Sequence, residues 1–166
     1  MGLFDIDVFD HKATLYPDAG RFNISTLPLV GQGMAKLLTL PLTDTSKPRA
    51  SLEYYANNFV YLSSFSVTQT SLVAAAQKAT GTTDANWEFE KSRTIEGDVR
   101  MLSEKASKGD FMAGAGLTFK YYMGEGRGGD YESKAKEDRE VLGLPEEDFD
   151  EVIRKVVAAG PLKRPF

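Results

Sequence analysis

The sequence predicts an α+β fold with a few strands and about five helices. Three short segments rich in β-branched and aromatic residues lie at 13–16, 59–65 and 86–92, and such segments are typical of strands. From residue 94 onward the apolar residues recur at the three- and four-residue spacing of amphipathic helices. The strands are therefore expected before residue 94, and only helices after it.

The first strand and the first helix have clear boundary signals. The strand at 13–16 runs into a Pro-Asp-x-Gly turn. A helix is expected at about 27–40, because Thr26 is a good N-cap, Pro28 falls in the first turn and Pro41 stops the periodic pattern. The apolar residues that recur at helical spacing in this segment are Leu27, Val30, Met34, Leu37 and Leu38.

The middle of the chain reads as a strand, a turn and a helix. The segment 59–65 begins with nearly continuous bulky residues, which suits a strand buried on both faces. Ser66 and Gln69 then have the spacing of a capping box, with Thr68 as an alternative cap. Gly81 supplies the C-terminal stop of this helix.

The rest of the chain is expected to form one more strand, followed by helices. In 86–92 apolar and charged residues alternate, which predicts a strand with one face in water. Four helices follow, at about 94–108, 110–123, 131–142 and from Pro145 to Gly160. The apolar stripe expected to be buried in the last of them consists of Phe149, Val152, Ile153, Val156 and Val157.

Composition excludes several classes of function. The 166 residues carry a net charge of −4 and have a pI of about 5.1, which argues against binding to a nucleic-acid backbone. The only clearly basic run is the terminal LKRPF. There are no cysteines, so disulfides, thiolate zinc sites and cysteine nucleophiles are excluded. With no apolar run of membrane-spanning length and no basic signal-peptide region, we expect a cytoplasmic protein that does not enter a membrane.

Residues 124–129, GEGRGG, satisfy the dinucleotide-binding pattern G-x-G-x-x-G. That pattern binds a pyrophosphate only after a strand, at the start of a helix, within a unit that has a second strand. Here Asp130 and Glu132 would repel a phosphate, and the 37 residues after Gly129 read as two helices. We therefore expect a loop between two helices and no cofactor-binding residues in this chain.

Other candidate catalytic groups have simpler explanations. His11 is the only histidine and no G-x-S-x-G elbow is present, so a surface histidine is favoured over a serine-hydrolase triad. The carboxylates of DIDVFD, at Asp5, Asp7 and Asp10, lack the glycine and closing glutamate of an EF-hand and are expected to be solvated. Glu88 and Glu90 are expected on the wet face of their strand. No tyrosine has a lysine four residues later, and neither catalytic residues nor metal ligands are assigned.

An aromatic cluster, FKYYM, offers the best candidate for a binding surface. Core packing is the favoured interpretation, and a hydrophobic pocket wall with tyrosine hydroxyls as polar handles is the alternative. The pocket would hold a small, largely apolar molecule. Its candidate residues are Phe65, Met112, Phe119, Tyr122 and Met123.

Several stretches together resemble the C-terminal half of fungal NmrA-like proteins, the isoflavone-reductase-like branch of the atypical short-chain dehydrogenases. They occur in the family's order and cover nearly the whole chain. The most specific are the strand-to-helix run at 59–81 and the series KGDF, GEGRGGDY and LGLPEED. The others are FDHKATLYPDAG, STLPLVGQGMAKLL, WEFE and EVIRKVV.

The resemblance implies that residues 1–166 form a single substrate-binding lobe of an NAD(P)H-dependent oxidoreductase. Family members place a Rossmann domain first, and this chain is expected to begin after it, so NADP(H) would be bound by the missing half and the lobe alone would not be a competent dehydrogenase. Two alternatives stay open. One is a non-enzymatic regulator or protein-interaction module, and the other is a cofactor-free cyclase or isomerase of fungal secondary metabolism.

The predicted strands would extend a larger sheet in the full-length family. Without that sheet they leave unpaired edges and an exposed apolar face. We therefore expect a homodimer or a protein partner that covers this surface.

Overall fold

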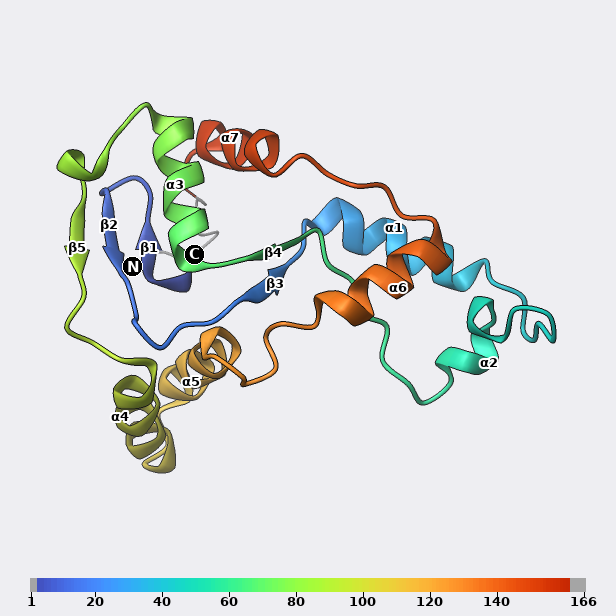
Figure 1. Ribbon diagram of the computed structural model, residues 1–166. Coiled ribbons are helices and arrows are strands. Elements are labelled where there is room, and N and C mark those ends of the chain that lie inside the picture. The colour runs from blue at the N-terminus through green and yellow to red at the C-terminus, as the bar shows by residue number, and fades with distance from the viewer. Residues whose placement is uncertain (1–2, 162–166) are drawn as a thin grey trace. The chain divides into compact units, whose positions relative to one another are not determined.

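The computed structural model describes residues 3–161, so the terminal basic run LKRPF lies outside the described residues (Figure 1). Within that range it contains seven α-helices and five short strands, which is an α+β fold. These elements belong to two compact units. Unit 1 comprises 3–22, 67–130 and 148–161, and unit 2 comprises 23–66 and 131–147. The assignment of the whole chain to one NmrA-like lobe stays a prediction.

Unit 1 contains a three-stranded sheet of β1 (Ile6–Asp7), β2 (Lys12–Thr14) and β5 (Glu88–Glu90). β1 pairs antiparallel with β2, and β2 pairs parallel with β5 (Figure 1). The strands predicted at 13–16 and 86–92 are confirmed, although both are shorter. Both glutamates of β5 are exposed while Phe89 between them is half-buried, as the alternating pattern predicted.

Helix α3 (Gln69–Thr80) packs on this sheet and completes the main core of unit 1. Its capping box is formed by Thr68 and Ser71, so the alternative cap is the correct one and the Ser66–Gln69 box is wrong. The helix ends as predicted at Gly81, which adopts a left-handed conformation with φ 69°. The buried core residues are Ile6, Ala13, Val73, Ala76 and Trp87.

Three further helices belong to unit 1. α4 (Ile95–Ser107) and α5 (Phe111–Met123) begin at the side-chain caps Thr94 and Asp110 and pack against each other, which confirms both predicted helices. α7 (Phe149–Ala159) packs on α3 (Figure 1).

The expected start of α7 at Pro145 is wrong, because the Asp148 carboxylate accepts a hydrogen bond from the Glu151 amide (2.8 Å) and caps the helix four residues later. The expected buried stripe of α7 is also corrected. Its members are half-buried, and Val156 is 60% exposed.

Unit 2 is built around α1 (Leu27–Leu38) and α6 (Glu132–Leu142), which contact each other. A short helix, α2 (Leu52–Tyr55), accompanies them. The strands β3 (Phe22–Ile24) and β4 (Phe65–Val67) pair with each other, and each has two residues in unit 2 and one in unit 1. The helices predicted at 27–40 and 131–142 are thus confirmed. The core of unit 2 contains Leu29, Leu142 and Leu144, with Leu37, Leu40, Val60 and Leu62 packed against them.

The apolar stripe that indicated α1 is only partly its buried face, because Leu37 packs on the core but three other members are exposed. Leu29 is 1% exposed and faces the core, whereas Leu27, Met34 and Leu38 are 85%, 48% and 70% exposed. These three residues are spaced by seven and four positions and therefore lie on one side of the helix. We call Leu27, Met34 and Leu38 the α1 stripe.

The strand expected at 59–65 is wrong over most of its length, because β4 begins only at Phe65. Val60 and Leu62 pack into the core of unit 2, while Phe59 is 76% exposed. The backbone amide of Tyr61 donates to the Asp138 carboxylate (2.7 Å) rather than to a neighbouring strand. A buried carboxylate thus replaces the strand partner that the β-rich composition suggested.

Candidate functional site

Unit 1 contains a nearly buried cluster of ionisable side chains, which we call the Tyr16 cluster. It consists of Asp5, Tyr16, Arg93, Asp98 and Lys120. Tyr16, Asp98 and Lys120 are each 5–6% exposed, and the Asp5 side chain is 11% exposed. Buried charges at this level are rare unless they are paired.

The pairing within the Tyr16 cluster is complete. The Tyr16 hydroxyl lies 2.8 Å from Asp98 Oδ2 and 3.1 Å from Asp5 Oδ2. The Lys120 ammonium donates to the Tyr16 oxygen (2.5 Å), lies 3.2 Å from Asp98 Oδ2 and forms an ion pair with Asp5. Arg93 binds both oxygens of Asp98, at 2.7 and 2.8 Å. Two carboxylates and two cations therefore balance.

The environment moves the pKa values of Tyr16 and Asp98 away from a catalytic range. Burial, and then the hydrogen bond with Asp98, raise the pKa of Tyr16 well above its ordinary value. Burial opposes ionisation of Asp98, but its hydrogen bonds from Arg93, Tyr16 and Lys120 lower the pKa of that carboxyl below its ordinary value. Tyr16 thus keeps its proton at neutral pH, whereas an acid–base catalyst needs a pKa near the working pH.

The Tyr16 cluster is therefore a polar core that ties the N-terminal segment to α4 and α5. Sequence reasoning missed it and placed Asp5 in a solvated acidic terminus, which is wrong. Lys120 gave the one available signal, because it stands in the otherwise apolar run from Phe111 to Met123, and a buried lysine requires partners.

A second buried carboxylate organises unit 2. Asp138 on α6 is 2% exposed. It accepts hydrogen bonds from the Tyr55 hydroxyl (2.9 Å) and the Tyr61 amide (2.7 Å), and Arg49 Nη2 lies 3.5 Å away. Burial, followed by the hydrogen bond to Asp138, raises the pKa of Tyr55 above its ordinary value. The carboxylate thus joins α2, α6 and the segment that precedes β4.

These two tyrosines predict a loss of stability in alkali. Tyr16 and Tyr55 stay protonated in the folded chain above the ordinary tyrosine pKa of 10.0, while they ionise in the unfolded chain. The folded state then binds more protons than the unfolded state, so the free energy of unfolding falls as the pH rises above about 10. We expect the double variant Tyr16→Phe/Tyr55→Phe to flatten this decline in urea titrations followed across that range. An unchanged alkaline decline in the double variant would show that these groups are not its source.

The glycine loop at 124–129 follows α5 and leads towards α6, so it connects two helices as predicted. The backbone at the start of this loop pairs with residues 18–20 of unit 1. The Gly20 amide donates to the Met123 carbonyl (2.9 Å), Ala19 and Gly124 form an antiparallel bridge, and the Glu125 amide donates to the Asp18 carbonyl (3.2 Å).

The cation of the glycine loop is also engaged within unit 1. Arg127 forms an ion pair with Glu96 and lies 4.9 Å from the centre of the Tyr121 ring. Within unit 1 the loop therefore pairs the amides of Gly124, Glu125 and Arg127 and the Arg127 cation, and it does not follow a strand as a pyrophosphate loop must.

Gly129 is required by close backbone packing, which gives a direct test of the loop. A Cβ atom at Gly129 would lie 1.8 Å from the Tyr122 carbonyl oxygen. We expect Gly129→Ala to lower the free energy of unfolding by about 2 to 3 kcal/mol, because backbone atoms must shift. Gly114→Ala is the matched control, since nothing lies within 4 Å of its added Cβ in α5, and it should raise stability by up to about 1 kcal/mol. Equal effects of the two substitutions in urea titrations would contradict this account of the loop.

The five residues predicted to line a pocket are distributed over both units. Phe65 starts β4 in unit 2, and the other four lie on α5 in unit 1. Met112 and Phe119 are exposed at 74% and 45%, whereas Met123 is fully buried and Tyr122 packs near Phe22, with ring centres 6.1 Å apart. Met123 thus fits the core-packing interpretation, and Met112 and Phe119 offer accessible apolar surface.

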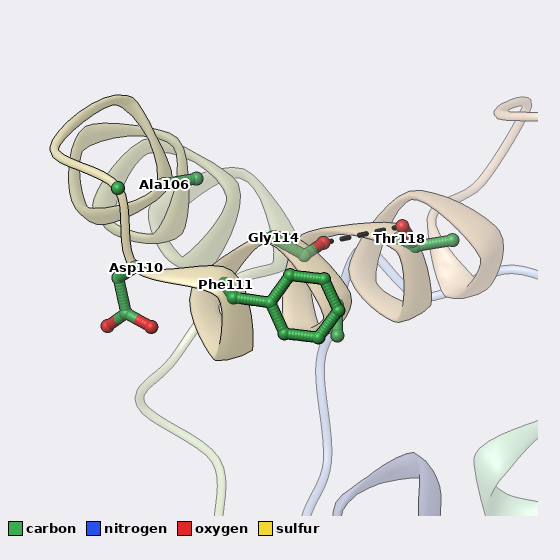
Figure 2. Close-up of a pocket in the computed structure, with 7 residues that line it drawn as sticks. Ala106, Asp110, Phe111, Gly114 and Thr118 are labelled. Atoms are coloured by element: carbon green, nitrogen blue, oxygen red, sulfur yellow. Dashed lines mark hydrogen bonds between the residues drawn. The ribbon is translucent and has the colours of Figure 1, made fainter.

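A shallow cavity of about 480 Å³ lies where α4 and α5 meet. Figure 2 shows the Phe111 ring lying along α5 near Gly114, and the hydrogen bond from the Thr118 hydroxyl to the Gly114 carbonyl (3.3 Å). The lining is mostly apolar and small. It comprises Ala106, Gly109, Asp110, Phe111, Gly114, Ala115 and Thr118. The cavity can accommodate an apolar group. Its two polar side chains have local partners, because Asp110 caps α5 through the Ala113 amide and the Thr118 hydroxyl donates to Gly114.

The remaining candidates from the sequence have structural roles. His11 is partly buried and stacks on Trp87 with ring centres 5.5 Å apart. Lys12 pairs with Glu88 across the sheet (2.9 Å). Within residues 3–161, no group of three histidine, aspartate or glutamate residues is placed to hold a metal ion. Over the same residues, no helix combines the length and the hydropathy that a bilayer crossing requires.

Comparison of the chain with protein-family models, with curated proteins and with solved structures found no match.

Proposed function

We propose that the chain is the substrate-binding lobe of an NmrA-like, NAD(P)H-dependent oxidoreductase of the cytoplasm. In this proposal the dinucleotide is bound by a domain that lies outside these 166 residues, and the lobe alone is not a competent dehydrogenase. The resemblance at 59–81 and around the glycine loop supports the family. The internal pairing of the glycine loop and the Tyr16 cluster supports a lobe without its own redox chemistry.

The observation that carries the proposal is the exposed α1 stripe. A helix that is apolar on two faces is normally covered on both. Leu29 and Leu37 face the core of unit 2, while Leu27, Met34 and Leu38 are largely exposed. Clustered exposed apolar residues mark interaction sites more often than they mark free surface. A second protein surface over the α1 stripe accounts for this helix.

The ligand-facing part of the proposal rests on α5. Phe111 and Met112 are 85% and 74% exposed beside the cavity between α4 and α5. Apolar side chains around a concave surface suit a small, largely apolar molecule. Phe119, at 45% exposure, extends this accessible apolar surface along the helix.

Sedimentation velocity tests whether a second copy covers the α1 stripe. We expect the wild-type chain to associate with increasing concentration, and the variant Leu27→Gln/Leu38→Gln to sediment as a monomer. Leu42→Gln is the matched control, because Leu42 is 77% exposed in the same unit but lies outside the helix. A wild-type chain that remains a stable monomer would contradict self-association.

A non-enzymatic regulator is the second candidate, since the same α1 stripe would serve a protein partner. An activity assay distinguishes the oxidoreductase proposal from the regulator proposal. The oxidoreductase proposal expects an added small, apolar acceptor to be reduced, with matching oxidation of NADPH, only when the lobe is combined with a dinucleotide-binding domain. The regulator proposal expects binding of the partner and no oxidation in the combined sample.

A further inference from the structure

Unit 2 contains a cavity of about 270 Å³ that is separate from every residue used above for ligand binding. It lies between the short helix α2, the segment leading to β4, and α6. Its walls combine aromatic rings with charged groups: Arg49, Tyr54, Asn58, Phe59, Tyr61, Lys134, Glu137 and Asp138. All eight residues belong to unit 2.

The charges around this cavity leave one cation available. Arg49 is held by Glu137 (2.5 Å) and lies 3.5 Å from Asp138, and Asp138 is occupied by Tyr55 and Tyr61. Lys134, in contrast, has no carboxylate within salt-bridge distance among residues 3–161. Its ammonium lies 3.4 Å from the Tyr61 hydroxyl and 4.9 Å from the centre of that ring. Arg49 is thus shared by two carboxylates, and Lys134 is the cation of the cavity lining that has no direct ion pair within the described part of the chain. Such a cation can pair with a ligand that carries a single negative charge.

The position of that negative charge is restricted. Glu137 and Asp138 line the same cavity and follow Lys134 by three and four positions on α6, so they would repel an anion placed near Arg49 or on their own side of Lys134. The anionic group must therefore approach Lys134 from the side of Tyr61. A phosphate, with nearly two charges at neutral pH, is matched less well by one lysine than a carboxylate is.

The aromatic side chains of the cavity wall indicate that the apolar part of the ligand is a flat ring. Tyr54 is held in place by Arg49, whose guanidinium carbon lies 5.3 Å from the ring centre. Phe59 is 76% exposed and lies 6.1 Å from Tyr61, centre to centre. A flat ring that packs against Phe59 and Tyr61 would bury this exposed surface and gain aromatic contact energy. The volume is below that of pockets for drug-sized molecules, so it fits one ring.

We propose that this cavity binds a small aryl carboxylate, a single aromatic ring with one carboxylate, with the carboxylate on Lys134 and the ring against Phe59 and Tyr61. This site does not rest on the oxidoreductase proposal, because it uses only side chains of unit 2 and no dinucleotide.

Titration of the full chain with phenylacetate, followed by amide chemical shifts, tests the site. We expect saturable shifts confined to the amides of 54–61 and 134–138. The neutral analogue phenylacetamide should bind about three- to fivefold more weakly, because it lacks the partly exposed ion pair. No saturable shifts in these two segments, or equal affinity for the two probes, would overturn the proposal.

Two exposed substitutions separate the charge from the ring. Lys134→Gln should reduce the affinity for phenylacetate to that for phenylacetamide, and should leave the affinity for phenylacetamide unchanged. Phe59→Ser should reduce the affinity for both probes. Lys136→Gln is the matched control on the exposed part of α6 and should change neither. Phenylacetate binding that is insensitive to Lys134→Gln would contradict the assigned carboxylate position.

Discussion

Replacing Lys120 with methionine is expected to lower the free energy of unfolding of unit 1 by about 3 to 5 kcal/mol, the cost of leaving a buried charge without its partner. Lys120 is 6% exposed and contacts Asp5, Asp98 and the Tyr16 hydroxyl. Methionine fills similar space but compensates neither carboxylate. Arg93 still neutralises Asp98, so the Asp5 carboxylate is left as the uncompensated group. Trp87, the only tryptophan, lies in unit 1 and reports its unfolding by fluorescence in urea.

Two further variants make this prediction specific. Lys120→Met/Asp5→Asn should recover part of the loss, because it removes the unpaired charge together with its partner. Lys108→Met should change stability by less than about 1 kcal/mol, since exposed ion pairs contribute little and the Lys108–Glu104 pair is about 70% exposed. If Lys120→Met costs no more than Lys108→Met, the Tyr16 cluster is not a stabilising core.

Replacing Asp138 with leucine is expected to destabilise unit 2 by about 3 kcal/mol. The substitution leaves the Tyr55 hydroxyl and the Tyr61 amide without acceptors, and each unsatisfied buried donor costs about 1 to 3 kcal/mol. The two hydrogen bonds are 2.9 and 2.7 Å long. Hydrogen exchange of the Tyr61 amide reports the effect locally, and its protection should be lost before that of the α6 amides.

Tyr55→Phe is the graded control for Asp138. It removes one donor and leaves the carboxylate bonded to the Tyr61 amide, so it should cost about 1 kcal/mol. Tyr61 exchange should then remain slow. A fast-exchanging Tyr61 amide in Tyr55→Phe, or a slow one in Asp138→Leu, would contradict the role of Asp138 as the partner of this backbone.

The helices could be predicted from the sequence because their ends carry local signals. Thr26 accepts the capping hydrogen bond that its position suggested, and Thr94 and Asp110 cap their helices in the same way. Gly81 and Gly143 adopt the left-handed conformation that ends a helix. The prediction of where α7 begins was wrong, and the reason is also local. Pro145 and Asp148 are both plausible helix starts, and only the geometry of the Asp148 cap distinguishes them.

The candidate site could not be predicted in the same way. The Tyr16 cluster joins residues separated by up to 115 positions in the chain, and no local spacing indicates such contacts. The same holds for the segment 59–65. Its strand-like composition correctly indicated that Val60 and Leu62 are packed in a core, but most of the segment does not pair with a neighbouring strand. Its backbone partner is a side chain 77 residues away, Asp138. Periodicity also could not show which of two apolar faces of α1 is buried.

Calorimetric titration of the full chain with NADPH tests most directly the proposal that these 166 residues do not themselves hold the dinucleotide. The loop at 124–129 pairs its backbone and Arg127 within unit 1, so we predict no saturable heat at micromolar affinity. The same titration with a separately supplied dinucleotide-binding domain is the positive control. Micromolar binding of NADPH by the chain alone would contradict the account.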